Sequence, residues 1–400
     1  MAGFSVRFLG CKVSQTDAQA LRERLLRDGH IESGGDVAIV NTCCVTNEAL
    51  AKSRQAASRA ARTHRRVYVT GCGAHLSADA FAGLPENVTV VRGQIEDAVE
   101  QVAGDVGAIG CVQADARLER VRAFVKIQDG CSFGCNFCVI PLVRGATRSR
   151  RAEAVLAEVR RRVVQGHREI VLTGVNLGCF RDRTAGYGLA GLIREVGAIA
   201  GVERLRLSSI EINHVDAELV AALRDTPVVG PHLHVPLQSG DDEVLRAMGR
   251  RYTVATYLRK LEPLRDFNLT ADVIVGFPAE DDAAFERTLA TVRAAGLTKV
   301  HVFPYSPRPG TRTASDDTVS PQVKKERSAR LRALSDEACR TRWDRKIGRA
   351  EVVLVDRPGR GYGADYSPWL VPGPIAAPIG ELVRVRGRAV TEEGIVADAA

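Results

Sequence analysis

Three cysteines stand close together near the middle of the chain, with a spacing that suits metal binding. They are Cys131, Cys135 and Cys138, within the stretch FVKIQDGCSFGCNFCVIP. Cysteine thiolates bind zinc ions and iron–sulfur clusters, and a closed site of either kind usually takes four protein ligands. No fourth cysteine follows closely, so one coordination position is left for another molecule. The spacing favours a 4Fe–4S cluster with one open iron, and a zinc site completed by a distant residue is the alternative.

A second set of cysteines follows three predicted strands in the first part of the chain. These short runs are rich in Val, Ile and aromatic residues, and they cover residues 4–10, 36–43 and 65–72. Helical segments between them favour a parallel α/β sheet, whose strands all end at the same edge. We therefore expect Cys11, Cys43 and Cys72 to lie close together.

Four cysteines have no comparable position in the sequence. Cys44 follows Cys43 directly, and because successive strand side chains alternate, we expect Cys44 to point to the opposite face. Cys111, Cys179 and Cys339 are expected to be small buried hydrophobic residues.

A second series of strands and helices occupies the middle of the chain. Six β/α repeats favour a complete or partial α/β barrel, with its chemistry at the carboxyl ends of the strands. The candidate strands are residues 123–128, 169–174, 204–209, 232–237, 271–277 and 299–305. A basic helix is predicted over residues 323–346, and short strands broken by Gly and Pro then predict a small β-barrel. The expected domains are therefore residues 1–112, 117–345 and 346–400.

The composition is that of a globular protein, with 45% hydrophobic and 26% charged residues in 400. No apolar run is long enough to cross a bilayer and no signal-peptide core is visible, so we expect no membrane contact and a cytoplasmic protein. The net charge of +8 is compatible with a polyanionic partner.

Two basic runs without acidic residues lie beside the two cysteine sets. At 100° per residue, the first run places four basic residues on one predicted helical face: Lys52, Arg59, Arg62 and Arg66. The second run follows the three-cysteine motif: Arg144, Arg148, Arg150 and Arg151. A solvated surface is the ordinary explanation of such runs, but their positions favour contacts with nucleic-acid phosphates.

The three-cysteine motif resembles the signature of the radical S-adenosylmethionine (SAM) superfamily, including the aromatic Phe137 before the last cysteine. The resemblance implies that the open iron binds SAM, which is then cleaved to a 5′-deoxyadenosyl radical, and that Phe137 packs near the adenine. It also implies SAM contacts at the ends of barrel strands: Gly174, Asn176, Ser209, Glu211 and Gln238. An ordinary polar turn remains the alternative for each of these, as a core position does for Phe137.

The amino-terminal motifs LGCKVSQTDA, NTCCVTNEALAKSRQ and VTGCGA resemble those of the methylthiotransferase family. So do RGATRSR, HVPLQSGDDEVLRAMGRRY and FPYSPRPGT, and the last segment resembles an RNA-binding TRAM domain. The resemblance implies that Cys11, Cys43 and Cys72 hold a second 4Fe–4S cluster with an open iron, which carries the sulfur. One departure is Ile212, where relatives have Pro after the residue that corresponds to Glu211.

Within that family the chain looks most like enzymes that methylthiolate threonylcarbamoyladenosine in tRNA, beside the anticodon. The implied partners are a tRNA anticodon stem-loop, an electron donor such as a flavodoxin or ferredoxin, and a sulfur source. Isopentenyladenosine in tRNA and a ribosomal protein are the alternative substrates. A non-catalytic iron–sulfur scaffold that binds RNA is the alternative outside catalysis.

Overall fold

The computed structural model describes residues 2–76, 79–108, 121–373 and 377–399. The chain divides into two compact units. The first contains Met1–Glu119, Asp129–Thr147 and Ser306–Ser315, and the second contains the remaining residues. The boundary expected between the first two domains falls within residues 109–120, outside the described residues, and so does Cys111. In the part of the chain that the structure describes, no helix has both the length and the apolar character needed to cross a bilayer.

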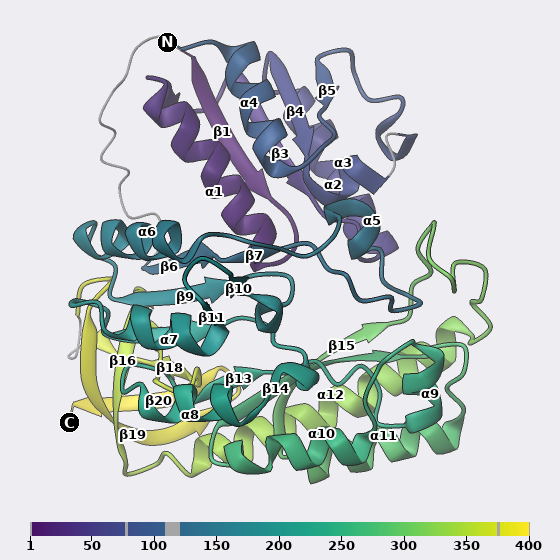
Figure 1. Cartoon of the computed structure of the whole chain (residues 1–400), viewed down its shortest axis with the longest axis vertical. Coiled ribbons are helices and arrows are strands. Elements are labelled where there is room, and N and C mark those ends of the chain that lie inside the picture. The colour runs from purple at the N-terminus through teal and green to yellow at the C-terminus, as the bar shows by residue number, and fades with distance from the viewer. Residues whose placement is uncertain (1, 77–78, 109–120, 374–376, 400) are drawn as a thin grey trace. The chain divides into compact units, whose positions relative to one another are not determined.

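The first unit contains a parallel five-stranded sheet in the order β2-β1-β3-β4-β5 (Figure 1). Its strands are β1 (Gly3–Phe8), β2 (Ile31–Glu32), β3 (Val37–Thr42), β4 (Arg66–Thr70) and β5 (Val88–Val90). Its helices are α1 (Lys12–Arg27), α2 (Asn47–Ala61), α3 (Gly71–Leu76) and α4 (Ile95–Val106). Alternate strand residues enter two apolar clusters, one containing α1 and α4 residues and the other α2 residues. The sheet is therefore covered by helices on both faces, as its continuous apolar strands predict.

The second unit contains six parallel strands. They are β6 (Arg122–Lys126), β9 (Glu169–Thr173), β12 (Arg204–Leu207), β13 (His232–His234), β14 (Asn268–Val275) and β15 (Leu297–Pro304). Two three-stranded sheets, β6-β9-β12 and β13-β14-β15, are linked by bridges from Leu205 to Val229 and from Ser209 to His234. The strand order therefore follows the chain, with β6 and β15 at the two edges. This arrangement is a partial (β/α) barrel, and it confirms the expected fold.

Helices connect these strands and cover one face of the sheet. The longer ones are α6 (Ala152–Val164), α7 (Leu189–Gly197), α8 (Ala217–Asp225), α10 (Val254–Leu261), α11 (Asp282–Ala294) and α12 (Pro321–Asp344). Shorter elements are β7 (Gln128–Asp129), β8 (Arg148–Ser149), β10 (Arg181–Asp182), β11 (Tyr187–Gly188) and α9 (Asp242–Ala247). The largest apolar core of the described residues lies between this helical layer and the strands.

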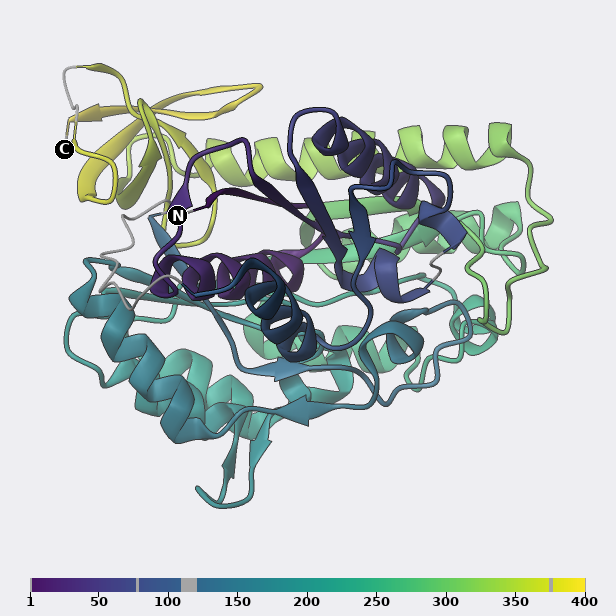
Figure 2. The same ribbon diagram turned by 90° about the horizontal axis from the view of Figure 1, so that it is seen from above.

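The chain ends in a small closed barrel, which α12 leads into (Figure 2). Its strands are β16 (Ala350–Arg357), β17 (Arg360–Tyr362), β18 (Pro368–Leu370), β19 (Leu382–Thr391) and β20 (Gly394–Ala399). The loop after β17 packs on the amino-terminal ends of the large barrel's strands. Arg206 donates to the Gly363 carbonyl at 2.7 Å, and Asn268 donates to the Asp365 carbonyl at 2.7 Å. The expected site residues lie at the opposite, carboxyl ends of the same strands, where the chemistry of such a barrel is expected.

Candidate active site

The amino-terminal cysteine set, Cys11, Cys43 and Cys72, follows three neighbouring strands of the sheet. Cys11 is exposed at the start of α1, Cys43 is buried just after β3, and Cys72 is buried in α3, which follows β4. A Cβ atom placed on Gly10 would lie only 3.2 Å from the Sγ atom of Cys43, so the turn before Cys11 approaches that thiol closely. The structure thus brings the three cysteines to one edge of the sheet.

Cys44 does not point away from this group, which corrects our expectation. β3 ends at Thr42, so the strand alternation that we assumed stops before the two cysteines. The Cys44 side chain is fully buried and forms a hydrogen bond with the side chain of Cys72, which together with burial raises the pKa of Cys44 well above its usual value. Burial likewise raises the pKa of Cys43 to about 11. The assignment of Cys43 as the ligand stays a prediction.

Arg144 is the central charged residue of this region. It ends the short helix α5 (Ile140–Arg144), and its Nε atom donates to the Cys72 Sγ atom at 3.1 Å. Its two terminal nitrogens bond Asp17 at 2.9 Å and Asp129 at 3.1 Å. The hydrogen bond from Cys44, and then the charge and hydrogen bond of Arg144, lower the pKa of Cys72 to about 7 despite its burial.

Because only 6% of Arg144 is exposed, its guanidinium is not available to phosphates. This corrects the expectation that Arg144 contacts RNA. In the sequence, Arg144 stands in a basic run. Its partners are not evident there, because Asp17 is distant in sequence and Asp129 precedes the cysteine motif. Its position is that of a buried cation that satisfies two carboxylates and one thiol.

The three-cysteine motif, Cys131, Cys135 and Cys138, lies on one loop of the same compact unit. The loop is closed at its base, where Cys131 donates its backbone N–H to the Gly145 carbonyl at 3.0 Å, and Ser132 and Thr147 exchange hydrogen bonds of 3.1 Å. Cys131, Cys135, Phe137 and Cys138 are all half-buried. Val139 and Val143, which follow directly, pack with Cys44 and Cys72 in one apolar cluster. Helix α5, which follows Cys138, therefore packs against Cys72 of the amino-terminal set.

Glycines precede cysteines of both sets and shape the turns. Gly71 and Gly130 have φ angles of +86° and +68°, a region that other residues adopt only with strain. A Cβ on Gly71 would lie 2.0 Å from Asn41 Oδ1, and one on Gly130 would lie 2.1 Å from the Ala146 carbonyl oxygen. The recurrent Gly-Cys pair at a strand end is a signal that sequence reasoning missed.

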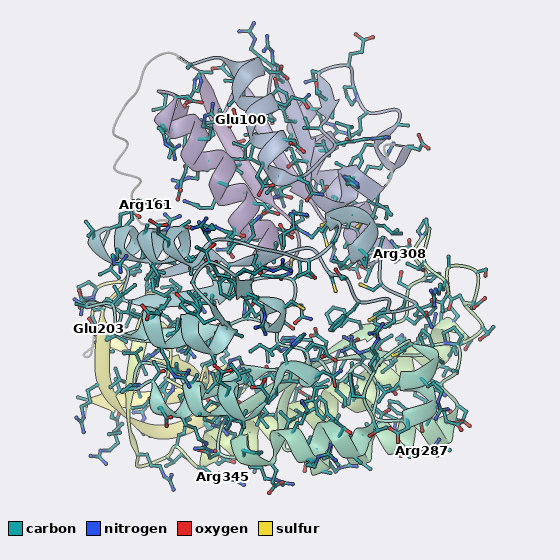
Figure 3. The ribbon with its side chains drawn as sticks, in the orientation of Figure 1. Glu100, Arg161, Glu203, Arg287, Arg308 and Arg345 are labelled. Carbon is teal, nitrogen blue, oxygen red and sulfur yellow. The ribbon has the colours of Figure 1, made fainter. Side chains whose placement is uncertain are left out.

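Arg308, in the motif FPYSPRPGT, was also missed. It is buried in the first unit, on the loop after β15 (Figure 3). Its guanidinium donates to the Cys44 carbonyl at 3.3 Å and to the side chains of Asn47 and Ser306. Arg308 thus fixes the turn that carries Cys43 and Cys44.

Five of the six expected SAM contacts belong to the second unit, at the carboxyl ends of its strands, whereas Phe137 belongs to the first unit. Asn176 donates its backbone N–H to Gln128 Oε1 at 2.8 Å, while its own Oδ1 atom is buried without a partner among the described residues. Gly174 packs tightly, because a Cβ there would lie 3.0 Å from the Gln128 carbonyl oxygen. The next residue, Leu177, donates to the Ser209 carbonyl at 3.3 Å and joins the two loops. A buried unsatisfied acceptor suits the ammonium group of an amino-acid ligand.

Two other expected contacts are held differently. Gln238 has a φ of +66°, which is unusual for a residue other than glycine and is typical of functional sites. Glu211 is buried, and its carboxylate accepts from the backbone and side chain of Asn213 at 2.8 and 3.0 Å. It caps the short helical turn Ile212–His214 and also pairs with Arg250 at 3.8 Å, and its expected contact with SAM stays a prediction.

The first basic run is divided between two elements. Lys52 and Arg59 lie on α2 and Arg62 caps it, all three exposed, but α2 ends at Ala61. Arg66 instead begins β4 and donates to the Asp105 carbonyl at 3.1 Å, so its expected place on the helical face is wrong. Lys52 is paired with Glu48 at 2.6 Å, an exposed i,i+4 pair that contributes little.

The second basic run has three members besides Arg144. Arg148 and Arg151 are exposed, whereas Arg150 is half-buried and pairs with Glu158 at 2.7 Å. The expected phosphate contacts that are exposed are therefore Lys52, which is paired with Glu48, Arg66, which bonds the Asp105 carbonyl, and Arg59, Arg62, Arg148 and Arg151.

Two cysteines outside the sets differ from one another. Cys339 is buried and donates to the Thr298 carbonyl at 3.0 Å, as expected for a core residue. Cys179 is half-buried instead, and its Sγ atom lies 3.4 Å from His214 Nε2. Burial lowers the pKa of His214.

Comparison with known proteins identifies the family. Residues 125–292 match the radical SAM superfamily, and residues 4–93 match a family described as uncharacterized protein family UPF0004. The threonylcarbamoyladenosine tRNA methylthiotransferase MtaB of Thermotoga maritima is 33% identical, over 98% of this chain and 95% of its own length. The chain belongs to the radical SAM methylthiotransferase family. The MtaB protein of Bacillus subtilis is 36% identical over 84% of this chain and 81% of its own length.

Other relatives extend this comparison. The tRNA-2-methylthio-N(6)-dimethylallyladenosine synthase of Paracoccus denitrificans is 33% identical over 95% of this chain and 93% of its own length. Among solved structures, the radical SAM methyltransferase TsrM of Kitasatospora setae, bound to tryptophan and a SAM analogue, covers 78% of this chain and 75% of its own chain. Its TM-score is 0.59 at 14% identity, which shows a shared fold.

Membership in the radical SAM methylthiotransferase family makes the protein an enzyme that uses SAM and a 4Fe–4S cluster. The residues present fit both groups. Cys131, Cys135 and Cys138 offer three thiolates and leave one iron for another ligand. Asn176 offers a buried oxygen, without a partner among the described residues, at the expected SAM site.

Proposed function

We propose that this enzyme transfers a methylthio group to the adenine ring of threonylcarbamoyladenosine, next to the anticodon of tRNA. The MtaB relatives of two organisms, at 33% and 36% identity, support this substrate. The observation that carries the two-cluster chemistry is the arrangement of the first unit. Two sets of three cysteines share that unit, and Arg144, six residues after one set, donates a hydrogen bond to a cysteine of the other.

Two 4Fe–4S clusters would be held by Cys131, Cys135 and Cys138 and by Cys11, Cys43 and Cys72. When bound, the first supplies reductive cleavage of SAM and the second supplies the sulfur atom. Gly174, Asn176, Ser209 and Gln238 would orient SAM at the strand ends. Arg144 donates a hydrogen bond to Cys72 Sγ and so favours its thiolate, the form that binds metal.

An anticodon loop is a suitable RNA substrate, because its bases can leave the stack and enter a pocket. Arg59, Arg62, Arg148 and Arg151 would contact its phosphates. The reaction would take place in the cytoplasm, and it needs an electron donor such as a flavodoxin or ferredoxin and a source of sulfur.

Nucleoside analysis of a deletion strain tests the substrate. Digested tRNA should lose methylthio-threonylcarbamoyladenosine and accumulate threonylcarbamoyladenosine, and the wild-type gene should reverse both changes. The Paracoccus relative makes isopentenyladenosine-type nucleosides the second candidate. Loss of their methylthio group instead would overturn the substrate proposal, as would loss from a ribosomal protein.

Cleavage of SAM tests the catalytic proposal against a non-catalytic scaffold. The reduced, anaerobically reconstituted enzyme should form 5′-deoxyadenosine from SAM. A variant with Cys131, Cys135 and Cys138 changed to Ala is the control, and it should form none. An equal yield from both proteins would show that the product does not come from this site.

A further inference from the structure

Three side chains of types that bind metal ions meet on the second unit, outside both cysteine sets. They are His234 on β13, Asp272 on β14 and His301 on β15. Each offers one ligand atom, and the three atoms all lie within 4.8 Å of one another. Neither the expected SAM contacts nor the cysteine chemistry uses them.

Strand pairing explains why these residues meet. Asp272 and His301 are direct partners in the parallel register of β14 and β15, and His234 pairs with Thr270, two residues before Asp272. Because side chains alternate along a strand, all four lie on the same face of the sheet. The alternate residues are buried in the main apolar core: Leu233, Ala271, Val273 and Val300. Figure 1 shows α10, α11 and α12 along these strands, so the polar group occupies the inner face of the partial barrel.

His234 is already oriented as a ligand. Its Nδ1 atom lies 2.9 Å from the hydroxyl of Thr270, and its Nε2 atom lies 3.3 Å from Asp272 Oδ2. Ligating histidines usually fix their second nitrogen in this way. In a tetrahedral shell with bonds of about 2.1 Å, two ligand atoms lie about 3.4 Å apart, which matches the separation of His234 and Asp272.

A layer of packed side chains supports Thr270. His232 Nε2 lies 3.1 Å from the Thr270 hydroxyl, and the His232 ring lies 5.1 Å from the Tyr366 ring. The guanidinium of Arg206 lies 4.6 Å from the centre of the same Tyr366 ring. The hydroxyl that orients His234 is thus part of a packed layer built partly by the carboxyl-terminal barrel.

We propose that His234, Asp272 and His301 bind a divalent transition-metal ion of the zinc type. Two neutral imidazoles and one carboxylate form a nitrogen and oxygen set that zinc and ferrous iron accept, with positions left for water or another oxygen donor. The set carries one negative charge, which attracts a cation. Within the described ranges, the only ion pair of Asp272 is the one with His234. The three residues include no cysteine, so the site shares no ligand with the expected iron–sulfur clusters.

Zinc binding by the full-length protein with its clusters loaded provides the test. The protein is equilibrated anaerobically with micromolar Zn²⁺, zinc and iron are counted by mass spectrometry, and the zinc environment is read by X-ray absorption. We expect one zinc per chain in a shell of imidazole nitrogen and oxygen at about 2.0–2.2 Å. Absence of zinc would overturn the proposal. A sulfur shell at about 2.3 Å would also overturn it, because it would place the ion on cysteines.

Variants tie the ion to these residues. His301→Ala removes an exposed ligand, and Asp272→Asn preserves the shape of the carboxylate, so neither should disturb the core. Each should weaken zinc binding by more than about 100-fold, and Thr270→Val, which frees His234, by about 10- to 100-fold. Lys299→Ala is the matched control, because Lys299 lies two residues before His301 and pairs with Asp336 at 3.1 Å. Unchanged affinity in His301→Ala, or equal loss in Lys299→Ala, would refute the site.

Discussion

The two cysteine sets lie in the same unit, but the cysteines of each set are brought together in a different way. Cys131, Cys135 and Cys138 lie on one short loop, closed at its base by hydrogen bonds between Ser132 and Thr147. Cys11, Cys43 and Cys72 instead follow three separate strands and meet only because β1, β3 and β4 are neighbours in a parallel sheet. The set Cys131, Cys135 and Cys138 is local in sequence, so we expect it to depend less on the sheet. The second depends on the sheet and on buried partners such as Arg144 and Arg308.

Removal of either set should produce the largest effects and separate their functions. Changing Cys131, Cys135 and Cys138 to Ala should remove about half of eight irons per chain and all cleavage of SAM. Changing Cys11, Cys43 and Cys72 to Ala should remove a similar amount of iron but leave that cleavage. Iron analysis and assay of 5′-deoxyadenosine measure both. If both variants lost cleavage equally, the division of labour between the sets would be wrong.

Arg144 should be the most sensitive single residue of the region that joins the sets. Arg144→Met removes the guanidinium that bonds the buried Asp17 and Asp129, and breaking such a buried pair costs about 3–5 kcal/mol. Arg148→Met is the control, since Arg148 is exposed and its loss should cost no more than about 0.5 kcal/mol. Anaerobic denaturant unfolding gives both values. Equal stability of the two variants would show that the buried network does not stabilise the unit.

Two glycines of the same loop offer a matched test of turn geometry. Gly130→Ala puts a Cβ 2.1 Å from the Ala146 carbonyl oxygen at a φ of +68°, and strain of this kind costs about 1–3 kcal/mol. Gly134→Ala has nothing within 4 Å of its new Cβ atom among the residues that the structure describes. We expect Gly130→Ala to lower the melting temperature and the iron content, and Gly134→Ala to change neither. Similar melting in both variants would contradict the geometry.

These comparisons also explain how far the sequence could lead. The six barrel strands were predictable because each is a short run in which apolar residues are continuous or alternate with polar ones, and the cysteine edge followed from parallel strand order. Arg66 was misplaced because a helical projection carries no information on where α2 ends. Arg144 was misassigned because its partner Asp17 is distant in sequence. The group of His234, Asp272 and His301 depends on the register of three strands, which no local pattern encodes.

The Cys43–Cys44 pair sharpens the same contrast, because two adjacent thiols contact different neighbours. Cys43 lies beside the turn of Gly10, and Cys44 bonds Cys72. Cys43→Ala should remove the amino-terminal cluster, whereas Cys44→Ala should retain it while losing the hydrogen bond that lowers the pKa of Cys72. Iron content and the electron paramagnetic resonance of the second cluster distinguish them. Loss of iron only in Cys44→Ala would reverse the ligand assignment.

The smallest expected effect concerns the exposed arginines of the first unit. Arg59→Glu with Arg62→Glu should weaken tRNA binding and lower the slope of log affinity against log salt by about 1 for each phosphate that the variant no longer neutralises. Cluster content should not change, because both side chains are exposed and neither is a cluster ligand. Arg332→Glu with Arg340→Glu, at exposed positions of α12, makes the same change in charge elsewhere. If both pairs lowered the slope equally, the effect would come from net charge alone, and the arginines of α2 would have no specific contact with RNA.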